Sequence, residues 1–162
     1  MVILILLSAF LSGSEVAIFG LTTAQKAKLN EDKNKNSERI INLLADPKKL
    51  LATILIGNNL VNVAIVIVSS FIMNEIFENY YLSPLLNFIT QVVVVTFLIL
   101  LFGEVIPKVY ANNYKVNFSR LMAAPISFLK IIFNPLSNLL ISSTSIIDRK
   151  IDKKIELLNP EE

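Results

Sequence analysis

The sequence predicts an all-α membrane protein with three transmembrane helices plus short amphipathic helices at the cytoplasmic interface. Of its 162 residues 54% are hydrophobic and 17% are charged, and the mean hydropathy is +0.62, well above the range of a soluble domain. The apolar residues also gather into runs about 20 residues long, the length that a helix needs to cross roughly 30 Å of hydrocarbon. We therefore expect residues 1–162 to form one polytopic domain in a lipid bilayer.

The first span is expected over residues 1–22. No basic residues precede this apolar run, no Ala-x-Ala-like cleavage site follows it and Glu15 lies inside it, so it does not have the pattern of a signal peptide. Residues 23–50 are polar and hold seven Lys or Arg against four Asp or Glu. This excess of basic residues predicts that the segment lies on the cytoplasmic side and that the N-terminus lies outside.

The second span is expected over residues 47–71. Within the basic segment before it, the apolar residues of Ser37–Leu44 have helical spacing. Asp46 and Pro47 then provide an N-cap and a first-turn proline for the next helix.

The third span is expected over residues 84–107. The preceding link, residues 74–83, holds acidic residues and tyrosines but no Lys or Arg, as is typical of an outer loop with interfacial aromatics. Ser83 and Pro84 repeat the cap signal that begins the second span.

Two further apolar stretches follow the third span, but Pro125 and Pro135 interrupt them and basic residues lie among them. A fourth crossing would also place the basic residues of 149–154 outside, against the positive-inside tendency. We expect interfacial helices over about residues 118–148 instead, with the C-terminus in the cytoplasm.

Composition also limits the chemistry of the protein. The chain has no Cys and no His, which excludes thiolate and imidazole metal sites, disulfides and Ser-His catalysis. The predicted spans offer no aspartate pair for an aspartyl mechanism, so an enzyme is the weakest hypothesis. A net charge of +2 is too small to suggest a nucleic-acid partner. Any metal must be bound by oxygen.

Three polar clusters lie inside the predicted spans, where polar groups normally face a partner or a water-filled cavity. In the first cluster, the serines and the glutamate share one helical face beside a glycine; in the second, two asparagines are spaced i, i+4. The clusters are Ser8, Ser12, Gly13 and Glu15; Gly57–Asn62, with Asn58 and Asn62 on one face; and Gly103–Lys108.

Pro107 gives the third cluster a free backbone oxygen, because proline has no N–H to donate to the carbonyl of Gly103. This oxygen lies next to Glu104 in the sequence. Hydroxyl, amide, carboxylate and carbonyl oxygens together form a site suited to magnesium or calcium.

Each cluster also has a structural interpretation. Serine and glycine at helical spacing are often packing contacts between transmembrane helices, and the asparagines could be interhelical hydrogen-bond partners. Glu104 could extend to the interface, and Glu15 could pair with a lysine at the inner surface.

Three motifs in this order resemble the CNNM/CorC family of magnesium transport proteins, and the resemblance runs through essentially the whole chain. The motifs are LSGSE at residues 11–15, IGNNLVN at 56–62 and FGEVIPK at 102–108. The last, Gly-Glu-x-x-Pro-Lys after a long apolar run, is the most specific.

The resemblance implies a homodimer of three-helix domains in a bacterial cell membrane, with a belt of short helices at the cytoplasmic face and a dehydrated Mg²⁺ bound among the spans. Glu15 and Asn59 match the motifs without an assigned role. Family members usually continue into nucleotide-binding CBS modules, and no nucleotide regulation is assigned to these residues. The implied metal ligands are the side chains of Ser12, Asn58, Asn62 and Glu104, with a carbonyl contribution from Gly103.

Two functions from different classes follow as expectations. The leading one is transport or export of magnesium through the intramembrane oxygen-ligand site. The alternative is a membrane-embedded metal-sensing or scaffolding domain that does not itself transport.

Overall fold

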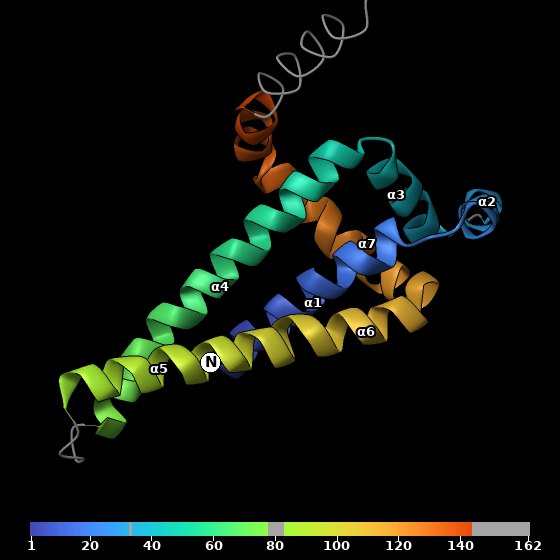
Figure 1. Ribbon diagram of the computed structural model, residues 1–162. Helices are drawn as coiled ribbons and strands as arrows, with labels where there is room; N and C mark the ends of the chain where they lie inside the picture. Colours follow the sequence, from blue (N-terminus) through green and yellow to red (C-terminus); the bar gives the residue numbers. More distant parts are fainter. Residues whose placement is uncertain (33, 78–82, 144–162) are drawn as a thin grey trace, which may run out of the picture.

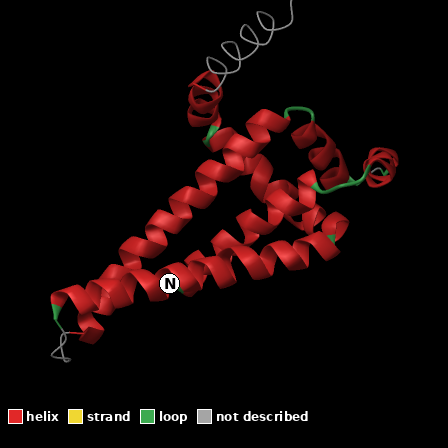
Figure 2. Cartoon of the chain, in the orientation of Figure 1, coloured by secondary structure: helices red, strands yellow, loops and turns green. Residues whose placement is uncertain are grey.

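The computed structural model describes residues 1–32, 34–77 and 83–143, and these residues form helices joined by short loops, with no strand among them (Figures 1 and 2). The elements follow one another as α1 (Val2–Phe19), α2 (Thr23–Glu31), α3 (Lys35–Leu44), α4 (Pro47–Phe77), α5 (Pro84–Leu98), the π-helix η1 (Ile99–Val105), α6 (Ile106–Asn113) and α7 (Lys115–Ile132). A further helix, Asn134–Ser143, follows α7. The all-α fold class predicted from the sequence is confirmed.

Three helices, the number predicted from the sequence, are each long and apolar enough to cross a membrane. They cover Val2–Phe19, Pro47–Met73 and Leu85–Asn113. The third continues beyond Pro107, because η1 and α6 extend α5 without a break. The chain is therefore a multi-pass membrane protein.

The cap signals of the sequence act as predicted. The Asp46 carboxylate accepts a hydrogen bond from the backbone N–H of Lys49 at 3.1 Å and caps α4. Ser83 caps α5 in the same way, accepting from the backbone N–H of Leu86 at 3.4 Å. Such caps satisfy backbone donors that would otherwise lack a partner in the first helical turn.

α1 is the central helix of the fold. In Figure 1, α4 and the continuous α5–α6 helix come together at one end and diverge toward the other, and α1 contacts α4, η1, α6 and α7. The larger apolar core lies where α1, α3, α4, α6 and α7 meet, whereas a smaller one of Ile65, Val95 and Ile99 joins α4 to α5 and η1. The core therefore concentrates at the end of the molecule that carries the basic segment.

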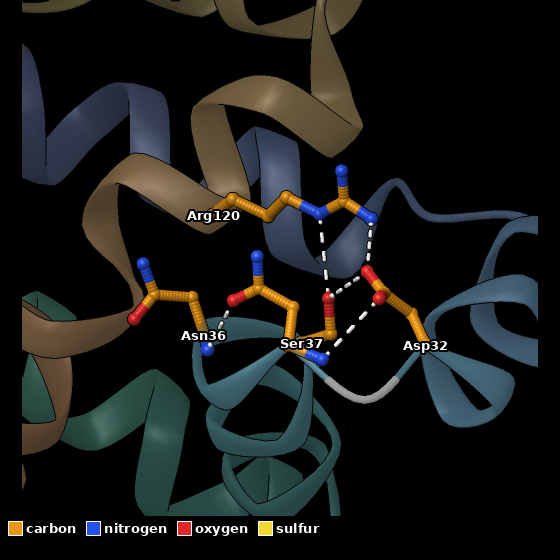
Figure 3. Close-up of polar contacts among 5 residues, drawn as sticks. Asp32, Asn36, Ser37 and Arg120 are labelled. Carbon is orange, nitrogen blue, oxygen red and sulfur yellow. Dashed lines mark hydrogen bonds and ion pairs between the residues drawn. The ribbon is translucent and has the colours of Figure 1, made fainter.

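A polar cluster fastens the basic segment to α7 (Figure 3). The guanidinium of Arg120 pairs with the Asp32 carboxylate at 2.6 Å and also donates from Nε to the Ser37 hydroxyl at 3.3 Å. The Ser37 hydroxyl in turn donates to Asp32 at 2.9 Å. One side chain of α7 thus contacts both the C-terminal end of α2 and the first turn of α3.

The region after the third span differs from the expectation at one point. α7 runs through Pro125 without a break, and the chain bends by 73° between α7 and Asn134–Ser143. A proline removes a single backbone bond, and a helix in an apolar environment tolerates it where neighbours compensate. By length and composition this bent pair could also form a broken span or a re-entrant loop. Residues 144–148 of the predicted interfacial helices lie outside the described residues.

Candidate metal site

Side chains from α1, α4 and η1 form a connected hydrogen-bond network between the spans. The Ser8 hydroxyl lies 2.8 Å from Oδ1 of Asn62 and 3.2 Å from Oδ1 of Asn58. Ser12 donates to the same Asn58 oxygen at 3.3 Å, and the Asn62 amide donates to Oε1 of Glu104 at 3.3 Å. Four of the predicted ligands, Ser12, Asn58, Asn62 and Glu104, therefore belong to one network.

Ser8 is the centre of this network, although it was not among the ligands predicted from the sequence. Both Ser8 and Ser12 have no exposed surface. Their i, i+4 spacing places both hydroxyls on one face of α1, and the two asparagine oxygens converge on that face. The sequence signal for Ser8 was present in this spacing, but a serine in a membrane helix is equally typical of simple packing.

Gly103, the fifth predicted ligand, allows η1 to approach α1 closely. A Cβ atom built on Gly103 would lie 2.9 Å from Oγ and 3.3 Å from Cβ of Ser8, closer than normal packing allows. The absence of a side chain at this position therefore brings the backbone of η1 next to the serine face.

The π-helix η1 was not foreseen in the sequence. At its C-terminal end the N–H of Ile106 bonds to the carbonyl of Leu101, five residues earlier. Pro107 follows directly and has no N–H for the ordinary α-helical bond to Gly103. The wider turn ahead of Pro107 accommodates the lack of a backbone N–H at this proline. Such π-bulges are frequent at functional sites. Gly103 and Glu104 both lie within it.

Glu15 and Asn59, the motif residues without an assigned role, lie outside the network. The Glu15 carboxylate forms an ion pair with Lys108 at 3.5 Å, which corresponds to the pairing considered from the sequence. Asn59 is exposed on the surface of α4. Gly57, in the same motif as Asn59, packs against Leu11 and Phe133 and has a structural role.

The network offers hydroxyl, amide and carboxylate oxygens, with Glu104 as its one acidic member. Within the described residues, no group of three or more His, Cys, Asp or Glu side chains could hold a metal ion. A cation at this site would therefore be held mainly by neutral dipoles, and hard cations such as Mg²⁺ and Ca²⁺ prefer such oxygen ligands.

Comparison with known proteins identifies the family to which this arrangement belongs. The family model described as the cyclin M transmembrane N-terminal domain matches residues 1–161. The chain belongs to the CNNM/CorC family. The resemblance inferred from the three motifs is therefore confirmed.

Individual relatives of this CNNM/CorC domain are distant but align over most of it. It is 30% identical over 155 residues to the UPF0053 inner membrane protein YfjD of Escherichia coli, covering 94% of this chain and 34% of that protein. It is 29% identical over 166 residues to a UPF0053 protein of Haemophilus influenzae, covering 100% of this chain and 38% of that protein. The chain thus spans about a third of the length of these relatives.

Proposed function

We propose that this CNNM/CorC domain transports a hard divalent cation, Mg²⁺ first, across the bacterial inner membrane through the oxygen site between its spans. The observation that carries the proposal is the hydrogen-bonded chain from Ser8 through Asn62 to Glu104. A carboxylate within a membrane span costs a few kcal/mol, so it is by default a functional candidate. Its partners here are neutral oxygen-bearing groups, which suit Mg²⁺ better than a softer metal.

The composition of the site favours passage over permanent binding. One carboxylate leaves a divalent ion with uncompensated charge, whereas tight cation sites use several anionic ligands. Conduction requires binding that is strong enough to admit the ion and weak enough to release it. The π-helix supports the same proposal, because irregular helices at membrane depth occur where they line a cavity and are common at transporter sites.

The alternative is a metal-sensing or scaffolding domain that does not transport. The same oxygen ligands would serve a sensor, since equilibrium binding needs no second opening. The proposed inner-membrane location is supported by the similarity to an inner membrane protein of Escherichia coli. The proposed orientation, with the N-terminus outside and the C-terminus inside, is supported by the charge asymmetry of the chain.

A homodimer is part of the proposal. Asn59 exposes a polar side chain on the surface of a predicted span. Small and polar residues on transmembrane helices favour helix–helix association over contact with lipid. A second copy of the chain that covers Asn59 would remove this unfavourable exposure.

The decisive experiment measures Mg²⁺ flux and Mg²⁺ binding with the same purified protein. In proteoliposomes with an enclosed Mg²⁺ indicator, we expect flux of Mg²⁺, and of Mn²⁺ because it accepts similar ligands. Zn²⁺ and Cu⁺ should gain no preference beyond their general affinity. Saturable Mg²⁺ binding in calorimetry without flux would support the sensor, and flux of monovalent ions alone would contradict the assignment of a divalent substrate.

A further inference from the structure

A separate pocket of about 390 Å³ lies away from the metal site, between α3, the start of α4 and the end of α7. This volume is within the range of small-ligand sites. The lining side chains come from these helices and from the residue that begins the helix after α7. They are Arg39, Asn42, Leu43, Lys49, Ser127, Lys130, Ile131 and Asn134.

Of the described residues that line this pocket, three are basic and none is acidic. Arg39, Lys49 and Lys130 are each half-buried, and among the described residues none of them forms an ion pair. Arg39 donates to the neutral side chain of Asn36 at 2.8 Å. The carboxylate of Asp46 instead caps α4 through the backbone N–H of Lys49. Within residues 1–32, 34–77 and 83–143, the positive charge of the pocket is therefore left without a counter-charge.

Like charges gathered in a concave, partly desolvated site repel one another more strongly than they would in water. An anion that binds between them removes this repulsion. A phosphate group fits the available donors well, because the planar guanidinium offers several N–H groups and each ammonium acts as a compact point charge. Asn42 and Asn134 add neutral amide donors at the same pocket.

The rim of the pocket favours a lipid as the source of the phosphate. Ile131 lines the pocket yet is 75% exposed, and Phe128, on the same helix, is 64% exposed. A soluble anion would gain nothing from these apolar surfaces, whereas the acyl chains of a phospholipid would cover them while its head group occupies the basic pocket. Basic pockets between helices at the membrane surface bind lipid head groups in this way.

We propose that the pocket of Arg39, Lys49 and Lys130 binds the phosphate of an anionic phospholipid and that this lipid holds α3 and α7 together at the membrane surface. The proposal is independent of whether the oxygen site transports metal. It assigns to the basic segment a specific lipid contact rather than a general attraction to a charged membrane.

The test compares two variants that lose equal charge. R39Q/K49Q/K130Q removes the three positive charges that line the pocket. K26Q/K28Q/K35Q removes three positive charges of the basic segment that do not line it. The whole chain, purified in a neutral detergent, is titrated with phosphatidylglycerol, phosphatidylcholine or inorganic phosphate. Bound lipid is counted by native mass spectrometry, and the thermal unfolding midpoint is measured in parallel.

We expect phosphatidylglycerol to remain bound to the unmodified protein and to raise its unfolding midpoint, with little effect of phosphatidylcholine. The pocket variant should bind phosphatidylglycerol at least tenfold more weakly, and the control variant should stay within about twofold of the unmodified protein. K49R/K130R, which keeps the charge, should retain binding. If the triple variant does not fold, K130Q replaces it, with an expected weakening of about threefold.

Two results would overturn the proposal. Equal loss of binding in the pocket and control variants would mean that the attraction is a general electrostatic one. Protection by inorganic phosphate at the concentrations where phosphatidylglycerol acts would assign the pocket to a soluble phosphate compound.

Discussion

The first and third spans of this protein have similar hydropathy but differ in how much of their surface is buried against the rest of the chain. Of an 18-residue apolar window in each span, 39% of the residues are buried in α1, whereas 11% are buried in the third span. Yet α1 carries the polar residues Ser8 and Ser12 at fully buried positions. Gly103 of the third span packs against Ser8. The comparison teaches that hydropathy identifies a membrane helix but does not say which face of it is the inside.

The two spans meet at one polar contact region, and this region divides their roles. α1 supplies neutral hydroxyls held by helix packing, while η1 supplies the charge and the irregular backbone. If this division is correct, changes in η1 should act mainly on cation binding, and changes in α1 should act on both packing and binding.

The largest effect is expected from Glu104→Gln, which removes the one charge of the network and keeps the size of the side chain. Affinity for Mg²⁺ should fall at least tenfold, about 1.4 kcal/mol, and flux should fall with it. The fold should survive, because Gln is less costly than Glu to bury in the absence of metal. Calorimetry and proteoliposome flux measure the two effects, with Glu75→Gln as a control that lies outside the network. Normal binding and transport by Glu104→Gln would remove Glu104 from the site.

A comparable test of the contact itself is Gly103→Ala. The added methyl would lie 2.9 Å from Oγ and 3.3 Å from Cβ of Ser8, so either η1 moves away from α1 or the Ser8 hydroxyl turns away from the asparagine oxygens. In both cases the geometry of the network changes. We expect at least a fivefold loss of Mg²⁺ affinity, since ligand geometry is strict for this ion. Gly57→Ala is the matched control, because its methyl would meet Leu11 at an ordinary 3.4 Å. Equal effects of the two variants on affinity would show that Gly103 has no special role.

Within α1, we expect Ser8→Ala to lower the free energy of unfolding more than Ser12→Ala does. Ser8 contacts both asparagine oxygens, whereas Ser12 contacts only that of Asn58 and at a longer distance. Interhelical hydrogen bonds in membranes contribute about 0.6 kcal/mol on average and up to about 1.7 kcal/mol. We expect the loss in free energy of unfolding to be near the upper value for Ser8→Ala and near the average for Ser12→Ala. Reversible unfolding in detergent measures both. The reverse order would mean that Ser12 is the central hydroxyl of the network.

Much of this fold follows from local sequence signals. The number of spans, the starts at Pro47 and Pro84 and the helical Ser37–Leu44 segment depend on hydropathy, caps and spacing, all of which are local. The meeting of Ser12, Asn58, Asn62 and Glu104 was predicted through the family motifs rather than through geometry. A single helical wheel contains no information about which neighbouring helix faces it.

Two features of the site could not be predicted from the sequence, for physical reasons. The π-helix depends on how the backbone rearranges around the missing donor of Pro107, and an α-helical periodicity does not encode that rearrangement. Ser8 became central only because Gly103, far along the chain, leaves room for η1 beside it. Pro125 shows the converse, since a strong local breaker signal did not break α7.

The smallest effect on stability is expected from the polar cluster of Arg120, Asp32 and Ser37, which joins the basic segment to α7. The ion pair is short, at 2.6 Å, but both side chains are more than a third exposed, so water screens most of its Coulomb energy. A double-mutant cycle of Arg120→Gln and Asp32→Asn should therefore give a coupling free energy of about 0.5–1 kcal/mol, read from unfolding in detergent. The coupling should shrink as salt is raised, whereas the contribution of the buried Ser8 contact should not. Mg²⁺ affinity should stay unchanged in all three variants, because this cluster touches no member of the oxygen network. A loss of affinity here would mean that packing at the basic end sets the geometry of the site, and the roles assigned to α1 and η1 would then extend through α7.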